Sequence, residues 1–153
     1  MHIYNVLKQE HDEAKDIMDN IMLCGENGLK LQYLQDLKKN ILIHAKTEEE
    51  VFYERLKKEP QLKDQIEHAI NDHKLVEMLF EKIDNISVED KLWTEIFLQI
   101  KQVLEHHITE EEDEIFFEAK KVLERQEEEN MAEMMVIEEP VIEEDLLRAG
   151  KIS

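Results

Sequence analysis

Apolar side chains recur at steps of three and four along most of the chain, which is the spacing of one face of an α-helix. The pattern predicts four helices, over about residues 3–23, 29–58, 61–84 and 90–125. Gly25 and Pro60 are suited to end the first two helices, and Ser87 with Asp90 forms a capping-box-like start for the fourth. Because the connections are short, we predict an all-α protein, an up-down-up-down antiparallel four-helix bundle.

Each of the four stripes contains a histidine inside its apolar face. These histidines are His11, His44, His73 and His107. Two stripes also hold a glutamate one turn further along the same face, Glu48 and Glu111. An unpaired carboxylate in a core costs several kcal/mol or shifts its pKa until it is neutral. The two glutamates therefore need a common partner, and a bound metal would supply it.

The four histidines are predicted to meet near the middle of the bundle. Counting the helical rise from the connections puts them at similar heights, apart from an offset of roughly one turn between His73 and His107. Imidazole and carboxylate together suit iron, manganese or zinc, and two carboxylates can bridge a pair of metals. A single buried histidine is usually a hydrogen-bonded core residue, and a single His-x-x-x-Glu pair is usually a surface ion pair. Four histidines at matched heights favour a metal site instead.

Several neighbouring residues are predicted to lie outside this site. Glu49 and Glu50 follow the first glutamate and point about 100° and 200° away from it around the helix. His2 and His68 are predicted at the surface. His106 points roughly 100° away from its neighbour in the stripe, but it stays a further candidate ligand if the fourth helix is rotated.

Composition narrows the class of protein. The 153 residues include only three glycines and two prolines, which leaves little room for β-turns and fits one all-helical domain. A formal net charge of -19 argues against nucleic acid or an anionic membrane as a partner. Cys24 is the only cysteine, and neither a signal-peptide pattern nor a membrane-length apolar run is present. We therefore expect a cytoplasmic protein.

The acidic tail after the bundle is harder to interpret. We place the bundle at 1–125 and the tail at 126–153, and we expect the tail to be partly helical, with a short fifth helix before Pro140. The tail could pack on the bundle, contact a protein partner or a second copy in a homodimer, or be partly disordered. Packing on the bundle is the preferred interpretation.

The motifs resemble the hemerythrin-like, or HHE cation-binding, family over about residues 1–125. They are Gln9-Glu10-His11, His44-Ala45-Lys46-Thr47-Glu48-Glu49-Glu50-Val51-Phe52-Tyr53, Asn71-Asp72-His73 and His106-His107-Ile108-Thr109-Glu110-Glu111-Glu112. The resemblance implies a four-helix bundle with a non-haem di-iron site, bridged by oxo or hydroxo and by carboxylates. Its terminal ligands would be the four in-stripe histidines, and its bridges would be Glu48 and Glu111. Zinc or manganese could substitute for the iron.

Two departures separate the chain from the oxygen-carrying hemerythrins. Those proteins have a second histidine on the third helix, four residues from the first, whereas this chain has Ala69 and Glu77 at the positions four away from His73. They also space the last histidine and carboxylate by five, which Glu112 would satisfy and Glu111 does not. Glu77 or a water could take the missing position. The departures favour a sensor, an iron-handling protein or a stress-response protein over a bulk oxygen carrier.

The leading functional hypothesis is a di-iron protein that binds or reacts with O2, nitric oxide or peroxide, and that is a metal-binding protein rather than an enzyme. One alternative is enzyme-like turnover of peroxide or nitric oxide, or repair of iron–sulfur centres by iron delivery. A second alternative is a structural bundle whose tail recruits a partner. The sequence has no glycine-rich phosphate loop and no nucleophile with a paired base.

Overall fold

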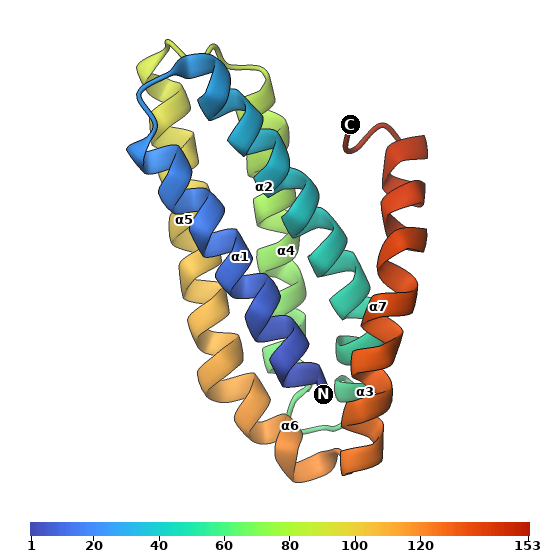
Figure 1. The fold of residues 1–153 in the computed structure, drawn as a ribbon. Helices are drawn as coiled ribbons and strands as arrows, with labels where there is room; N and C mark the ends of the chain where they lie inside the picture. The colour runs from blue at the N-terminus through green and yellow to red at the C-terminus, as the bar shows by residue number, and fades with distance from the viewer.

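The computed structural model describes residues 1–153, and all of its regular structure is helical (Figure 1). Its elements are α1 (Ile3–Leu23), α2 (Asn27–Glu48), the π-helical turn η1 (Glu49–Tyr53), α3 (Glu54–Leu56), α4 (Lys63–Asp84), α5 (Lys91–Glu110), the π-helical turn η2 (Glu111–Ile115), α6 (Phe116–Val122) and α7 (Arg125–Arg148). The prediction of an all-helical bundle is confirmed. No helix is long and apolar enough to cross a membrane.

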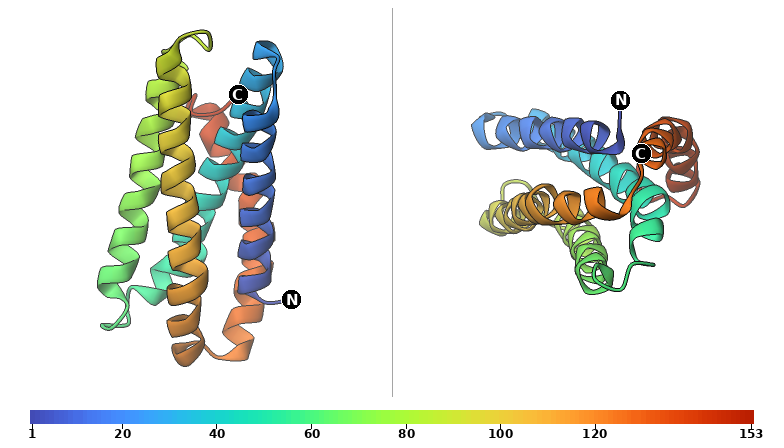
Figure 2. Two further views of the ribbon diagram at one scale, coloured as in Figure 1. Left: turned by 90° about the vertical axis from the view of Figure 1, so that its left-hand side faces the viewer. Right: turned by 90° about the horizontal axis from the view of Figure 1, so that it is seen from below.

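The helices form two packed pairs with an additional helix outside them. Helix α1 packs against α2, and α4 packs against α5. Helix α7 lies along the outside of the first pair and contacts both α1 and α2 (Figure 2). The side chains of Glu26 and Asp90 accept hydrogen bonds from the first free backbone N–H groups of α2 and α5, which satisfies donors that a helix start would otherwise leave unpaired.

The apolar core is divided into two large clusters along the bundle axis. One lies at the end that holds the N-terminus and includes Leu7, Phe52 and Ile115. The other lies toward the opposite end and includes Ala14 and Ile41. On each long helix the in-stripe histidine lies between residues of the two clusters. The bundle therefore has a polar layer between two apolar halves.

Two of the predicted helices contain a π-helical turn that the apolar pattern did not predict. In each turn a backbone N–H donates to the carbonyl five residues earlier, from Glu54 to Glu49 and from Phe116 to Glu111. Each turn therefore holds one residue more than a regular helix does, and each begins at or directly after one of the in-stripe glutamates. Such turns are rare and are frequent at functional sites.

The tail differs from the expectation of a short fifth helix before Pro140. Helix α7 is 24 residues long and continues through this proline. Met131 and Met135 are buried in the N-terminal cluster, and beyond the proline Ile142 and Leu146 are buried against α2. A proline inside a helix costs about 3 kcal/mol, whereas each large apolar side chain that is buried contributes about 1.5–3 kcal/mol. Burial on both sides of Pro140 thus outweighs the break, and the tail packs on the bundle.

Candidate metal centre

The structure brings the six residues predicted as ligands into one buried cluster. They are His11, His44, Glu48, His73, His107 and Glu111. They come from α1, α2, α4 and α5 and from the turn η2 that follows α5, and both glutamate side chains are fully buried. His73 and His107 were expected to differ in height by about one turn, yet their Nε2 atoms lie 3.1 Å apart. The packing of α4 on α5 removes the offset that counting from the connection suggested.

The cluster has two groups of ligand atoms that share Glu48. One group contains His11, His44, Glu48 and Glu111, and the other contains Glu48, His73 and His107. Oε1 of Glu48 lies 3.5 Å from Nε2 of His44 and 3.4 Å from Nε2 of His73. Oε1 of Glu111 lies 3.1 Å from Nε2 of His11. The Glu48 carboxylate thus lies between His44 of one group and His73 of the other.

Several buried polar atoms in the cluster have no hydrogen-bond partner. They are Nε2 of His11, Nε2 of His44, both carboxylate oxygens of Glu48, and Oε1 of Glu111. Most buried polar atoms in proteins have such a partner, and leaving one unpaired costs about 1–3 kcal/mol. Here five unpaired atoms point into one space. Imidazole nitrogens and carboxylate oxygens are metal ligands, so the residues fit a bound metal and provide the buried glutamates with the common partner that they need.

Each histidine of the cluster is held from its outer side by a second carboxylate. The contacts from Nδ1 are His11 to Glu112 at 2.7 Å, His44 to Glu10 at 2.6 Å, His73 to Glu49 at 2.8 Å and His107 to Asp72 at 3.2 Å. When Nδ1 donates its proton to a carboxylate, the lone pair is on Nε2, which here faces the cluster. This outer hydrogen bond fixes the tautomer and the ring orientation that a metal ligand requires.

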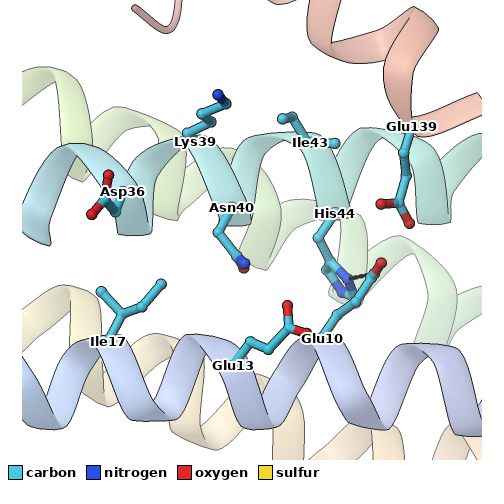
Figure 3. A pocket seen from close by; sticks show the side chains of 9 residues that line it. All are labelled: Glu10, Glu13, Ile17, Asp36, Lys39, Asn40, Ile43, His44 and Glu139. Carbon is cyan, nitrogen blue, oxygen red and sulfur yellow. Dashed lines mark hydrogen bonds and ion pairs between the residues drawn. The ribbon is translucent and has the colours of Figure 1, made fainter.

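Figure 3 shows the outer side of His44, where His44 and the Glu10 carboxylate that contacts it both line a surface pocket of about 360 Å³. Glu139 of α7 lines the same pocket. Burial and the neighbouring Glu10 raise the pKa of Glu139 to about 8, so this carboxyl group is protonated at neutral pH. Helix α7 therefore contributes to the surroundings of the cluster as well as to the core.

Charges inside the cluster compensate one another when no metal is bound. Burial opposes the charged form of His44, but Glu48 and Glu10 outweigh it and raise its pKa well above the usual value. For His73 the same balance, with Glu48 and Glu49 outweighing burial, raises the pKa to about 9. Burial alone would raise the pKa of Glu48, yet His44 and His73 hold it well below the usual value. Protons on the imidazoles thus balance the carboxylates that a cation would otherwise neutralise.

Tyr53 also contacts the cluster, and this contact was not predicted from the sequence. Its phenol donates a hydrogen bond to Glu111, and its ring stacks on His73 with the centroids 5.6 Å apart. Burial, followed by the charges of Glu111 and Glu48, raises the pKa of Tyr53 well above its usual value. In a regular helix Tyr53 would point about 140° away from Glu48. The π-helical turn η1 brings the side chain inward. A spacing of five residues from the glutamate did not predict this orientation, because it assumes a regular helix.

The further candidates lie outside the cluster. Glu77 pairs with Lys151 at 2.9 Å on the surface, and the exposed His106 pairs with Glu110 at 2.9 Å, so neither reaches the cluster. Glu112 contacts His11 from its outer side. The expectation that Glu49 lies away from the site is wrong, because one of its carboxylate oxygens lies 2.8 Å from Nδ1 of His73.

A helical bundle with a buried cluster of histidines and glutamates is a protein able to bind metal in its core. The sequence matches the family model of the hemerythrin HHE cation binding domain over residues 2–119, and the chain belongs to this family. The matched region contains the whole cluster, and α7 lies beyond it. Comparison with curated proteins and with solved structures gave no match.

Proposed function

We propose that the protein is a non-haem di-iron protein that binds or reacts with O2, nitric oxide or peroxide. The observation that carries the proposal is the shared Glu48, whose two unpaired oxygens lie between two groups of imidazoles. One cation held by the group with His11 would leave His73 and His107 unused, whereas two cations would engage both groups. Helices α1, α2, α4 and α5 fit the up-down-up-down bundle expected from the sequence, since the ribbon reverses direction at their connections (Figure 1).

The two groups differ in how completely the protein surrounds a cation. The group with His11 offers four ligand residues, and the group with His73 offers three. Metal sites that keep a position free of protein ligands are the ones that accept an external molecule. We therefore assign small-molecule binding to the side of the cluster that contains His73 and His107. An iron pair bound here would supply redox chemistry toward such a molecule.

The side chains around this open side determine how a small molecule would be held. Tyr53 stacks on His73 and keeps its proton because of burial, and its phenol donates this proton to Glu111. Phe52 packs against Tyr53 and also contacts Phe116, which stacks on His11 in the other group of ligands. Apolar surroundings limit water and favour a small molecule, such as a diatomic molecule or peroxide.

Reversible oxygen carriage is the less favoured role. The position one turn before His73 is Ala69, which is buried in the apolar cluster and has no ligand atom. The site thus has one imidazole fewer than an oxygen carrier uses, which supports sensing, iron handling or a stress response. Turnover of peroxide or nitric oxide, or iron delivery to iron–sulfur centres, would use the same open side. Steady-state consumption of peroxide distinguishes turnover from simple binding.

Metal analysis after expression with iron tests the proposal. We expect two iron atoms per chain and an absorption spectrum that changes on exposure of the ferrous protein to air. Glu48→Ala should lose most of the iron, while Glu50→Ala, a change at an exposed position on the same helix, should keep it. One tightly bound ion at saturation would contradict the dinuclear site, and a wild-type iron content in Glu48→Ala would contradict the bridging role.

A further inference from the structure

A second group of histidine and carboxylate side chains lies on the surface between α4 and α5. His68 and Asp72 are one turn apart on α4, and Glu110 faces them from α5. We call these three residues the surface cluster. One ligand atom from each lies within 4.8 Å of the other two. None of the three belongs to the buried cluster, and the function proposed above does not use the surface cluster as a site.

Both carboxylates of the surface cluster lie close to the imidazole of His68. Nε2 of His68 lies 3.3 Å from Oε2 of Glu110 and 3.6 Å from Oδ2 of Asp72. The other oxygen of Glu110 lies 2.9 Å from Nε2 of His106. Glu110 thus contacts His106 on its own helix, α5, and faces His68 on α4. Its orientation is set before any ligand arrives.

The surface cluster also lacks the cations that usually compensate such carboxylates. Neither Asp72 nor Glu110 has a lysine or arginine within ion-pair distance, and the ion pairs of both involve histidines alone. With neutral histidines the cluster carries two negative charges on a chain whose net charge is -19. Two carboxylates and a nearby imidazole with no fixed positive partner attract a divalent cation. The combination of nitrogen and oxygen ligands favours a first-row transition cation over Mg²⁺ or Ca²⁺.

We propose that His68, Asp72 and Glu110 form a surface site for a first-row divalent transition cation, with His106 positioning Glu110. The side chains of His68 and His106 are 58% and 67% exposed, so solvent cations reach the site without any movement of the fold. Asp72 also accepts the hydrogen bond from Nδ1 of His107. The surface site and the buried cluster therefore share one carboxylate, and a cation at the surface is separated from the buried ligands by a single side chain.

Zinc titration of the iron-loaded full-length protein, followed by calorimetry and metal analysis, tests the proposal. We expect the wild type to bind one Zn²⁺ without losing iron. His68→Gln and Glu110→Gln should each weaken this binding by about tenfold or more. Glu105→Gln is the matched control, since it removes an exposed charge on α5 that pairs with Lys101 and should leave zinc affinity unchanged.

Three results would overturn the surface site. They are the absence of zinc uptake by the wild type, zinc uptake matched by loss of iron, and equal zinc affinity in the wild type and both cluster variants. Because both variants change partly exposed side chains, circular dichroism should show wild-type helix content. The difference in zinc uptake between the wild type and His68→Gln does not depend on which metal fills the core. Failure of the surface site is thus distinguishable from failure of the di-iron proposal.

Discussion

The carboxylate of Glu49 lies 2.8 Å from Nδ1 of His73. The preceding residue, Glu48, lies 3.4 Å from Nε2 of the same ring. Two consecutive glutamates therefore contact opposite sides of one imidazole, the first inside the cluster and the second at its outer side. Glu49 opens the π-helical turn η1, so the irregular turn and the orientation of His73 are parts of one arrangement.

Glu49→Ala is expected to weaken metal binding by about 10- to 100-fold, because His73 loses the acceptor that fixes its tautomer. Glu50→Ala changes the next residue, which is exposed and has no contact with a cluster histidine, and should bind metal as the wild type does. Competition with a chelator of known affinity measures both. Equal affinities for the two variants would show that the outer hydrogen bond has no effect on the site.

Tyr53→Phe is expected to destabilise the metal-free protein by about 1–3 kcal/mol, because Oε2 of Glu111 loses its hydrogen-bond donor in a buried site. Tyr33→Phe removes a phenol at a half-buried position of α2 with no hydrogen-bond partner and serves as the control. Urea denaturation of the chelated proteins gives the free energies of unfolding. A loss no larger than that of the control would show that the phenol does not support Glu111.

Removal of the metal is expected to leave a folded but weaker bundle. Binding to the folded state alone adds about 4 kcal/mol when free metal exceeds its Kd a thousandfold. For a chain of this size such a contribution corresponds to a rise on the order of 10 °C in melting temperature. Differential scanning calorimetry with and without a chelator measures the change. An identical melting temperature in both samples would argue that the polar layer holds no metal.

The stability of the metal-free protein is expected to fall as the pH rises from about 6.5 to 9. Despite burial, Glu48 and Glu49 raise the pKa of His73 from 6.5 to about 9. Protonation of His73 therefore stabilises the fold fully below pH 6.5, and this contribution is lost as the pH rises through 9. Glu139 adds to the trend, since its pKa of about 8 makes its ionisation unfavourable in the folded state.

Urea denaturation of the chelated protein at pH 6.5 and pH 9 checks this sign. Glu139→Gln should reduce the part of the slope that lies below pH 8. A metal-free protein that is more stable at pH 9 than at pH 6.5 would contradict the balance of charges described for the cluster.

Pro140→Ala is expected to stabilise the protein by about 1–3 kcal/mol, because alanine restores a backbone N–H inside α7 and has a far higher helix propensity. Pro140 is exposed, so the substitution removes no core contact. Val141→Ala at the next exposed position should change the free energy of unfolding by no more than about 0.5 kcal/mol. Destabilisation by Pro140→Ala would mean that the proline fixes the path of α7 across the bundle.

The apolar stripes predicted the helices and the inward residues well, because one strong period of 3.6 governs most of the chain. The first helix has the predicted bounds, and all six predicted ligands face one cluster. The outer contacts of Glu10 and Asp72 were not predicted, because these two residues lie on polar faces and look like solvated residues. Only the packing of neighbouring helices brings such side chains onto the histidines.

The wrong expectation for the tail and the unpredicted contacts of Tyr53 have a different origin. A proline is a strong local signal, but it was outweighed by burial of Met135 and Ile142 on its two sides, which depends on contacts with distant helices. The position of Tyr53 depends on a π-helical turn. The side-chain pattern does not reveal where the backbone hydrogen bonds change from a spacing of four residues to a spacing of five. Both depend on tertiary contacts that a local pattern does not contain.

The additional residue of the π-helical turn η1 changes the direction of the residues that follow it, including Leu56 in the core. Leu56 follows Glu48 by eight residues, which at about 100° per residue would leave it about 80° away from the glutamate in a regular helix. With seven residues the angle would be about 20°. A chain shortened by one residue could therefore keep Leu56 in the core on a regular helix. The core therefore does not need the additional residue, which instead changes the directions of Glu49 and Tyr53. Deletion of the exposed Glu50 should preserve the fold and remove the contacts of Glu49 and Tyr53 with the cluster.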